Sequence, residues 1–251
     1  MARVLVTGGT GTLGSHVVGR LLATGHTVST LARHPPVSRV PGVGHHCGDV
    51  RTGAGLEAAV AAVDAVVHTA TSARASRAVE VDGTAHVTAA AASAEAHLLY
   101  ISIVGVDQMS FPYYRAKHEA EQVVERGGAA FTILRATQFH DLVDRFLSWR
   151  LFPVTGHLCF QPVDTAEVAA RLVDLVEAGP SGRVEDFGGP EVVALRHLAA
   201  TRRRITGSRS LLLRFPPVGF LADFDRGLHL TPDHTAGTVT WSRWLEARGR
   251  R

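Results

Sequence analysis

Apolar and polar positions alternate with two different periods along the first half of the chain. Short runs rich in β-branched residues predict strands at Arg3 to Thr7, Thr27 to Leu31, His45 to Cys47, Ala65 to Thr69, Leu98 to Ser102 and Thr132 to Arg135. The stretches between them have helical spacing and predict helices at Leu13 to Ala23, Gly55 to Ala62, Val79 to Ala94 and Tyr113 to Glu125. Strands that alternate with helices predict an α/β fold, a doubly wound parallel sheet with both faces covered.

The alternation weakens after Ala136. Helices are predicted there at Asp141 to Arg150, Thr165 to Val176, Leu195 to Arg204 and Ser242 to Ala247, separated by loops that contain proline and glycine. We therefore predict two parts. Residues 1–136 form the sheet domain, and residues 137–251 form a smaller C-terminal lobe, some of whose elements return to pack on the sheet domain.

Glycines 8, 11 and 14 lie between the first predicted strand and the first predicted helix. This spacing suits a tight turn, a close approach of backbone to pyrophosphate, and close packing of helix on strand. The start of the helix offers unpaired N–H groups and a positive dipole end to phosphates. The pattern predicts a Rossmann-type dinucleotide site, with candidate binding residues Gly8, Thr10, Gly11, Thr12, Leu13 and Gly14.

The charges that follow this turn favour NADP over NAD. An NAD site needs an acid about 20 residues after the turn for the ribose 2′-hydroxyl, whereas a 2′-phosphate needs arginine. Residues 1–48 contain no Asp or Glu, and Arg33 and His34 end the second predicted strand. We expect Arg33 to bind the 2′-phosphate of NADPH with help from His34; a solvated strand-end charge is the alternative. Asp49 is a candidate for the adenine amino group or a plain turn residue. Thr69 and Ala70 should line the cofactor's path.

Lys117 is the only lysine among 26 basic residues. Tyr113 precedes it by four positions, and residues at this spacing lie on one face of a helix. A lysine differs from an arginine because its charge is compact and its pKa responds to burial and to neighbouring charges. Ser102 ends the fifth predicted strand. The end of this strand and the start of the helix that follows it can bring Ser102, Tyr113 and Lys117 together. The alternative is a lysine placed by chance on a solvated helix.

Composition excludes other classes of protein. Cys47 and Cys159 are too few for a disulfide framework or a cysteine-based zinc site, and the 14 histidines show no compact ligand spacing, so no metal is predicted. A net charge of +3 with 6% aromatic residues lacks the dense, aromatic-rich basic patch of a nucleic-acid binder. No apolar run approaches the roughly 18 residues of a membrane span. We expect a cytoplasmic monomer or homodimer with no nucleic-acid or membrane partner.

Taken together, the motifs resemble those of the short-chain dehydrogenase/reductases, specifically the atypical NmrA-like NAD(P)-binding branch. The segments that carry the resemblance are Thr7 to Gly14, Gly48 to Val50, Val66 to Ala70, Val81 to Thr84, Tyr100 to Ser102, Tyr113 to Lys117, Leu134 to Phe139, Pro162 to Ala169 and Leu230 to His234. The resemblance implies that Val50, Ala136 and Thr137 also contact the cofactor. It implies that Gln138 and Phe139 contact the substrate, together with Ser102 and Tyr113. Asp82 stands near a position where many members have asparagine.

The reaction that the resemblance implies is a reduction by NADPH of a small carbonyl, imine or quinone-like substrate. Tyr113 would donate a proton to the substrate oxygen, Lys117 would favour the phenolate and hold the nicotinamide ribose, and Ser102 would orient the oxygen. Tyr114 is not assigned this role, because its partner at the same spacing is His118.

Two other functions stay open. The first is a non-catalytic NADP(H)-sensing module that acts through a protein partner, as some NmrA-like relatives do. The second, a sugar-nucleotide epimerase, is less favoured because the chain is short for the large substrate lobe of those enzymes.

Overall fold

The computed structural model describes residues 1–34, 40–73, 77–149, 151–208 and 211–249. The chain forms two compact units, each built from segments distant in sequence. The first comprises Met1–Ser102, Ala116–Leu134 and Ala169–Val184, and the second comprises Ile103–Arg115, Arg135–Val168 and Glu185–Arg251. The sequence suggested residues 1–136 and 137–251, with elements of the second part returning to pack on the first.

The first unit contains a seven-stranded sheet with the order β3-β2-β1-β4-β5-β6-β9. The strands are β1 (Arg3–Thr7), β2 (Thr27–Ala32), β3 (Val43–Cys47), β4 (Ala65–His68), β5 (His97–Ile103), β6 (Phe131–Ala136) and β9 (Gly182–Arg183). Pairing is parallel between β1 and β2, β1 and β4, β2 and β3, β4 and β5, and β6 and β9. All six predicted strands and the doubly wound fold class are confirmed. The strand order reverses between β1 and β4, where ligands bind beyond the strand ends in such sheets.

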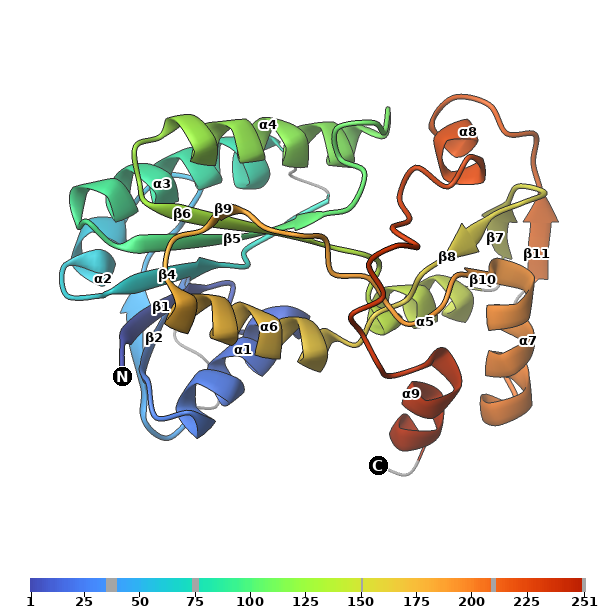
Figure 1. Cartoon of the computed structure of the whole chain (residues 1–251), viewed down its shortest axis with the longest axis horizontal. Coiled ribbons are helices and arrows are strands. Elements are labelled where there is room, and N and C mark those ends of the chain that lie inside the picture. The colour runs from blue at the N-terminus through green and yellow to red at the C-terminus, as the bar shows by residue number, and fades with distance from the viewer. Residues whose placement is uncertain (35–39, 74–76, 150, 209–210, 250–251) are drawn as a thin grey trace. The chain divides into compact units, whose positions relative to one another are not determined.

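Helices cover both faces of this sheet: Figure 1 shows α3 and α4 on one face and α1 and α6 on the other. The helices of this part are α1 (Thr12–Ala23), α2 (Leu56–Val60), α3 (Gly83–Ser93), α4 (Pro112–Arg126) and α6 (Thr165–Ala178). Apolar strand residues such as Leu5, Leu98 and Ile133 pack against helix residues such as Val87 and Val124. The predicted helix Val79 to Ala94 is divided: a π-helix, η1 (Arg77–Asp82), precedes α3.

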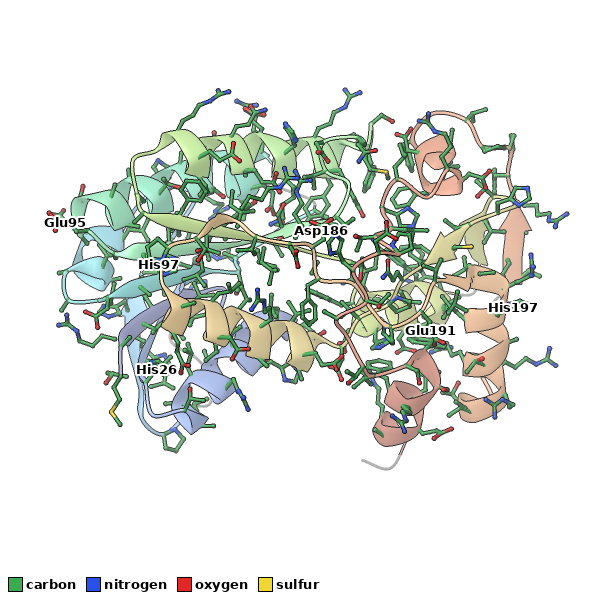
Figure 2. The ribbon with its side chains drawn as sticks, in the orientation of Figure 1. His26, Glu95, His97, Asp186, Glu191 and His197 are labelled. Atoms are coloured by element: carbon green, nitrogen blue, oxygen red, sulfur yellow. The ribbon has the colours of Figure 1, made fainter. Side chains whose placement is uncertain are left out.

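Buried histidines link neighbouring elements of this unit. His68, at the end of β4, lies 2.6 Å through Nδ1 from the Thr7 hydroxyl and 3.1 Å through Nε2 from that of Thr84. His97, labelled in Figure 2, begins β5 and lies 2.9 Å from the Thr132 hydroxyl of β6. Burial lowers the pKa of both imidazoles to about 4, with Lys117 adding to the effect at His68. Both rings are therefore neutral at pH 7.

The second unit is built from short elements around its own core. They are α5 (His140–Ser148), β7 (Leu151–Val154), β8 (Cys159–Phe160), β10 (Val193–Ala194), α7 (Leu195–Thr206), β11 (Leu211–Arg214), α8 (Phe220–Asp225) and α9 (Trp241–Arg248). β7 pairs with β11 in parallel, and β8 pairs with β10 antiparallel. The core includes Val143, Leu147, Leu198 and Trp241. The predicted helices match α5, α6, α7 and α9, although the predicted end at Arg150 lies outside the described residues.

Candidate active site

The glycine turn closes tightly on itself. The N–H of Gly11 donates to the carbonyl oxygen of Gly8 at 2.9 Å, and Gly8 has a φ of +72° that favours glycine. A Cβ on Gly14 would lie 2.2 Å from that same Gly8 oxygen. Gly11 caps α1 without any side chain, so the backbone at the helix start stays open. Thr10 and Thr12 are exposed, whereas Leu13 and Gly14 are buried.

The loop after β4 packs directly against this turn. The N–H and hydroxyl of Thr69 both donate to the carbonyl oxygen of Thr7, at 3.1 and 2.7 Å. A Cβ on Gly8 would approach the backbone of Ala70 to 2.7 Å. Residue 8 therefore has no space for a side chain next to Ala70. The turn, the open helix start and this loop fit a dinucleotide pyrophosphate, which binds at such a strand-to-helix turn.

Two arginines and one acid gather after β2 and β3. Arg33 and His34 follow β2 and are exposed. The Asp49 carboxylate accepts hydrogen bonds from the Arg51 guanidinium and from the Arg51 N–H. The Arg51 hydrogen bonds chiefly, and the charge of Arg33 to a smaller extent, hold the pKa of Asp49 below its usual value. Arg51 was not predicted from the sequence. Its guanidinium binds the Asp49 carboxylate, which was a candidate for binding the adenine amino group.

Val50, the last predicted contact of this group, has a structural role in the first unit. It is half-buried and packs against the core. A Cβ on Gly83 would lie 3.3 Å from its Cγ2 atom, and its carbonyl oxygen lies 2.9 Å from Nδ1 of His86. These contacts fix the loop after β3 to α3.

Ser102 lies near the end of β5 with its side chain buried. The residue is 3% exposed, and its hydroxyl has no hydrogen-bond partner within the described part of the chain. A buried polar group without a partner costs free energy, on the order of 1–3 kcal/mol. Such a hydroxyl is available to a substrate oxygen, which is the role expected of Ser102.

Lys117 is buried, with 3% of the residue exposed, and its ammonium meets three acceptors in the first unit. Nζ donates to the Tyr100 hydroxyl at 3.1 Å and to the Ile101 carbonyl at 2.9 Å. It also forms an ion pair of 3.1 Å with Oε2 of Glu80. Two of its N–H donors thus have oxygen acceptors, and the Glu80 carboxylate supplies the opposite charge. Lys117 is therefore an internal cation and not a solvated helix charge.

Glu80 is fully buried on η1. Its Oε1 atom accepts hydrogen bonds from the Thr71 hydroxyl at 2.6 Å and the Ser72 N–H at 2.8 Å. Burial raises the pKa of Glu80, but Lys117 and these hydrogen bonds outweigh it and leave the pKa below its usual value. Glu80 is thus ionised at pH 7. Sequence reasoning missed it and pointed to Asp82, which is exposed.

Tyr113 and Tyr114 begin α4 and belong to the second unit. Their rings meet edge to face with centroids 6.4 Å apart, in an apolar cluster that includes Met109 and Phe224. Tyr114 is buried, and burial raises the pKa of its phenol. Tyr113 is half-buried. Of the two phenols, Tyr113 is the one more open to a ligand.

The predicted residues that follow β6 are tied to other segments of the second unit. Thr137 accepts a hydrogen bond from the Gly189 N–H at 3.2 Å, and the Gln138 amide donates to the His229 carbonyl at 3.2 Å. Single β-bridges join Ala136 to Phe187 and Phe139 to Val163. These bonds hold residues 136–139 in place. What they contact in a complex stays a prediction.

Comparisons with known proteins agree with this geometry. A family model described as NAD(P)H-binding matches residues 8–178. The (4-alkanoyl-5-oxo-2,5-dihydrofuran-3-yl)methyl phosphate reductase of Streptomyces griseus is 31% identical over an alignment of 231 positions, which covers 86% of this chain and 77% of that protein.

Solved structures show the same fold. The NADPH-dependent quinone oxidoreductase QOR2 of Escherichia coli, complexed with NADPH, superposes with a TM-score of 0.82 at 19% identity, covering 98% of this chain and 99% of that one. The Bordetella bronchiseptica enzyme WbmH, in complex with NAD+, gives 0.76 at 18% identity, covering 98% and 97%. The chain therefore belongs to the NAD(P)H-binding family.

Proposed function

We propose that this protein is an NADPH-dependent reductase of a small carbonyl, imine or quinone-like compound. The observation that carries the proposal is the buried hydroxyl of Ser102, which has no partner among the described residues. The same unit holds the buried ammonium of Lys117 and the glycine turn. A donor, a cation and a dinucleotide cradle are the parts that a hydride-transfer site needs.

The chain's own residues would handle the proton and the substrate oxygen. A dinucleotide held at the glycine turn would supply the hydride for the electrophilic carbon of the substrate. Ser102 donates a hydrogen bond to the substrate oxygen and orients it. Tyr113 transfers its phenolic proton to that oxygen, so that a carbonyl becomes an alcohol. Lys117, one helical turn later on α4, tunes the affinity of the Tyr113 phenol for its proton.

The preference for NADPH over NADH rests on positive charge. Arg33 and Arg51 both act on Asp49, and residues 1–48 contain no acid. A guanidinium binds a 2′-phosphate with two parallel hydrogen bonds, whereas an NAD site uses a carboxylate on the 2′-hydroxyl. We expect NADPH to raise the melting temperature more than NADH, and Arg33→Ala to remove that difference. An equal or larger shift with NADH would contradict the proposal.

The relatives support a substrate that carries a carbonyl group. The name of the Streptomyces griseus reductase describes alkanoyl and oxo groups, and the Escherichia coli protein is a quinone oxidoreductase. A panel of small ketones, enones, quinones and cyclic imines therefore suits a first screen with NADPH.

The direct test of the mechanism is Tyr113→Phe. Loss of the proton donor should lower kcat by roughly 100-fold to 10,000-fold, the range found for general acid catalysis, while NADPH binding is retained. Tyr114→Phe is the matched control, because it removes the buried phenol of the adjacent residue; its kcat should stay within a few-fold of wild type. Unchanged turnover in Tyr113→Phe would remove this residue from the mechanism.

A second function is supported by the internal contacts of Lys117. Its ammonium donates hydrogen bonds to Tyr100 and Ile101 and forms an ion pair with Glu80. This arrangement also suits a non-catalytic NADP(H)-sensing module that acts through a protein partner. Such a module would bind oxidised and reduced cofactor equally and turn over nothing on the panel.

A further inference from the structure

The sequence assigns no role to Glu80, yet it connects three elements of the first unit. One carboxylate oxygen holds the hydroxyl of Thr71 and the N–H of Ser72. The other faces the ammonium of Lys117 at 3.1 Å. Thr71 follows Thr69 and Ala70, which pack against the glycine turn. Glu80 thus joins the loop beside the dinucleotide cradle to the only lysine of the chain.

We propose that Glu80 is a positioning residue of the reduction, which fixes the Lys117 ammonium in place and cancels its charge. The inference rests on the proposed function and specifies how Lys117 acts on Tyr113. Each residue of the pair is almost fully buried, with side-chain exposures of 4% and 0%. A buried charge without a partner destabilises the folded protein, so removing either residue alone would leave the other as an uncompensated charge.

The consequence concerns the proton of Tyr113. An isolated ammonium one helical turn away lowers the pKa of a phenol, because it stabilises the phenolate. With a carboxylate 3.1 Å from the ammonium, the two charges largely compensate at a distance. Tyr113 then keeps its proton at neutral pH and is ready to donate it, which suits reduction. The same site without Glu80 would favour the phenolate, the form needed for oxidation.

Other titratable groups lie on the elements around the pair. His68 on β4 is neutral, because burial, together with Lys117, lowers its pKa to about 4. Tyr100 on β5 accepts a hydrogen bond from Lys117 through its hydroxyl. Two further acids, Glu119 and Glu121, lie on α4 itself. Glu119 pairs with Arg77 of η1 at 3.3 Å on the surface, and Glu121 is buried.

The experiment compares two Glu→Gln changes that each break an ion pair between η1 and α4. Glu80→Gln removes the buried carboxylate, and Glu119→Gln removes the exposed one. The titration of Tyr113 is followed by NMR of protein labelled with ¹³Cζ-tyrosine, in which three tyrosines give three signals and Tyr113→Phe identifies the relevant one. This readout needs neither substrate nor turnover, so it separates this inference from the proposed function.

We expect Glu80→Gln to lower the pKa of Tyr113 by about one unit, because the Lys117 ammonium then acts on the phenol without the carboxylate that offset its charge. Glu119→Gln should leave it unchanged. If a substrate is found, the basic limb of the kcat profile should move to lower pH in the same variant. An unmoved Tyr113 titration in folded Glu80→Gln would overturn the proposal.

A double variant keeps the test valid if Glu80→Gln does not fold. Glutamine cannot accept from Thr71, Ser72 and Lys117 together, because one of its two terminal atoms is a donor. Glu80→Gln/Lys117→Met removes both charges and the unmatched donor. Because the pair is nearly neutral, the Tyr113 pKa in this variant should stay within a few tenths of wild type. A rise of about one unit would show that Lys117 acted uncompensated and would refute the proposal.

Discussion

Two glycines on α1 offer a sharp test of the dinucleotide cradle. A Cβ on Gly14 would lie 2.2 Å from the carbonyl oxygen of Gly8 and 2.8 Å from Cα of Gly9. All of these are backbone atoms, which cannot move away as a flexible side chain would. A Cβ on Gly19, five residues further along the helix, would meet nothing within 4 Å. Gly14→Ala and Gly19→Ala are therefore the same change on one helix, with opposite expected results.

The magnitudes follow from packing and from helix propensity. Gly14→Ala must push the turn away from the helix, and one excess methyl group in a packed site costs roughly 1–3 kcal/mol. For a chain of this length, each kcal/mol shifts the melting temperature by about 2–4 °C, so a fall of several degrees is expected. Gly19→Ala removes a flexible residue from a helix interior and should add about 1 kcal/mol, raising the melting temperature by a few degrees.

The assay is thermal unfolding with and without NADPH. Wild type and Gly19→Ala should both gain stability from a saturating cofactor, by about 2.7 kcal/mol at 100 times the dissociation constant. Gly14→Ala should lose most of that gain, because the Gly8 carbonyl and the helix start move apart. The reasoning fails if Gly14→Ala retains the full NADPH shift, or if Gly19→Ala destabilises the protein as much as Gly14→Ala does.

Two further predictions concern stability. The pKa values of His68 and His229 are lowered by burial to about 4, against about 6.5 in the unfolded chain, so the unfolded state binds protons that the folded state does not. This contribution, roughly 3 kcal/mol per histidine, is fully present above pH 6.5 and is lost as the pH falls toward 4; equal urea stability at pH 7 and pH 5 would contradict it. Asp223 accepts hydrogen bonds from the N–H and hydroxyl of Ser110 and from the Arg226 guanidinium. Asp223→Asn should cost about 1–3 kcal/mol in urea unfolding and Arg226→Gln, at an exposed guanidinium, less than about 1; the reverse order would refute this assignment.

The sequence predicted the sheet because its strands carry strong local signals. β1, β2 and β4 to β6 are apolar runs bounded by turns, and each was located within one or two residues. The strands β8, β9 and β10 have two residues each, too short for any period to show. They form because segments distant in sequence supply their partners.

The cradle was predictable because its residues lie together in sequence. Glycines 8, 11 and 14 form a single turn whose spacing carries the information. The pairing of Asp49 with Arg51 is also local, but either an adenine contact or a plain turn is compatible with an aspartate at that position. Only the observed hydrogen bonds show that the carboxylate is already engaged by Arg51.

Glu80 was missed for a different physical reason. Residues 77–82 form a π-helix, in which hydrogen bonds run from residue i to i+5, so each turn holds more residues than the α-helical period assumes. A period of 3.6 residues therefore predicts the wrong positions for the buried side chains of this turn. The difference separates Glu80, which is fully buried, from Asp82, which is exposed.

The position of Glu80 also explains why the chain has a lysine at residue 117 while its other basic residues are arginine. The three acceptors around Nζ lie at 2.9, 3.1 and 3.1 Å from a single atom. A compact ammonium satisfies three such acceptors at once, whereas the planar guanidinium spreads five donors over a rigid fork. An arginine would leave donors unmatched in a space where the lysine is 3% exposed. The lysine is therefore required first by the buried carboxylate, and whatever it does for Tyr113 acts through that pair.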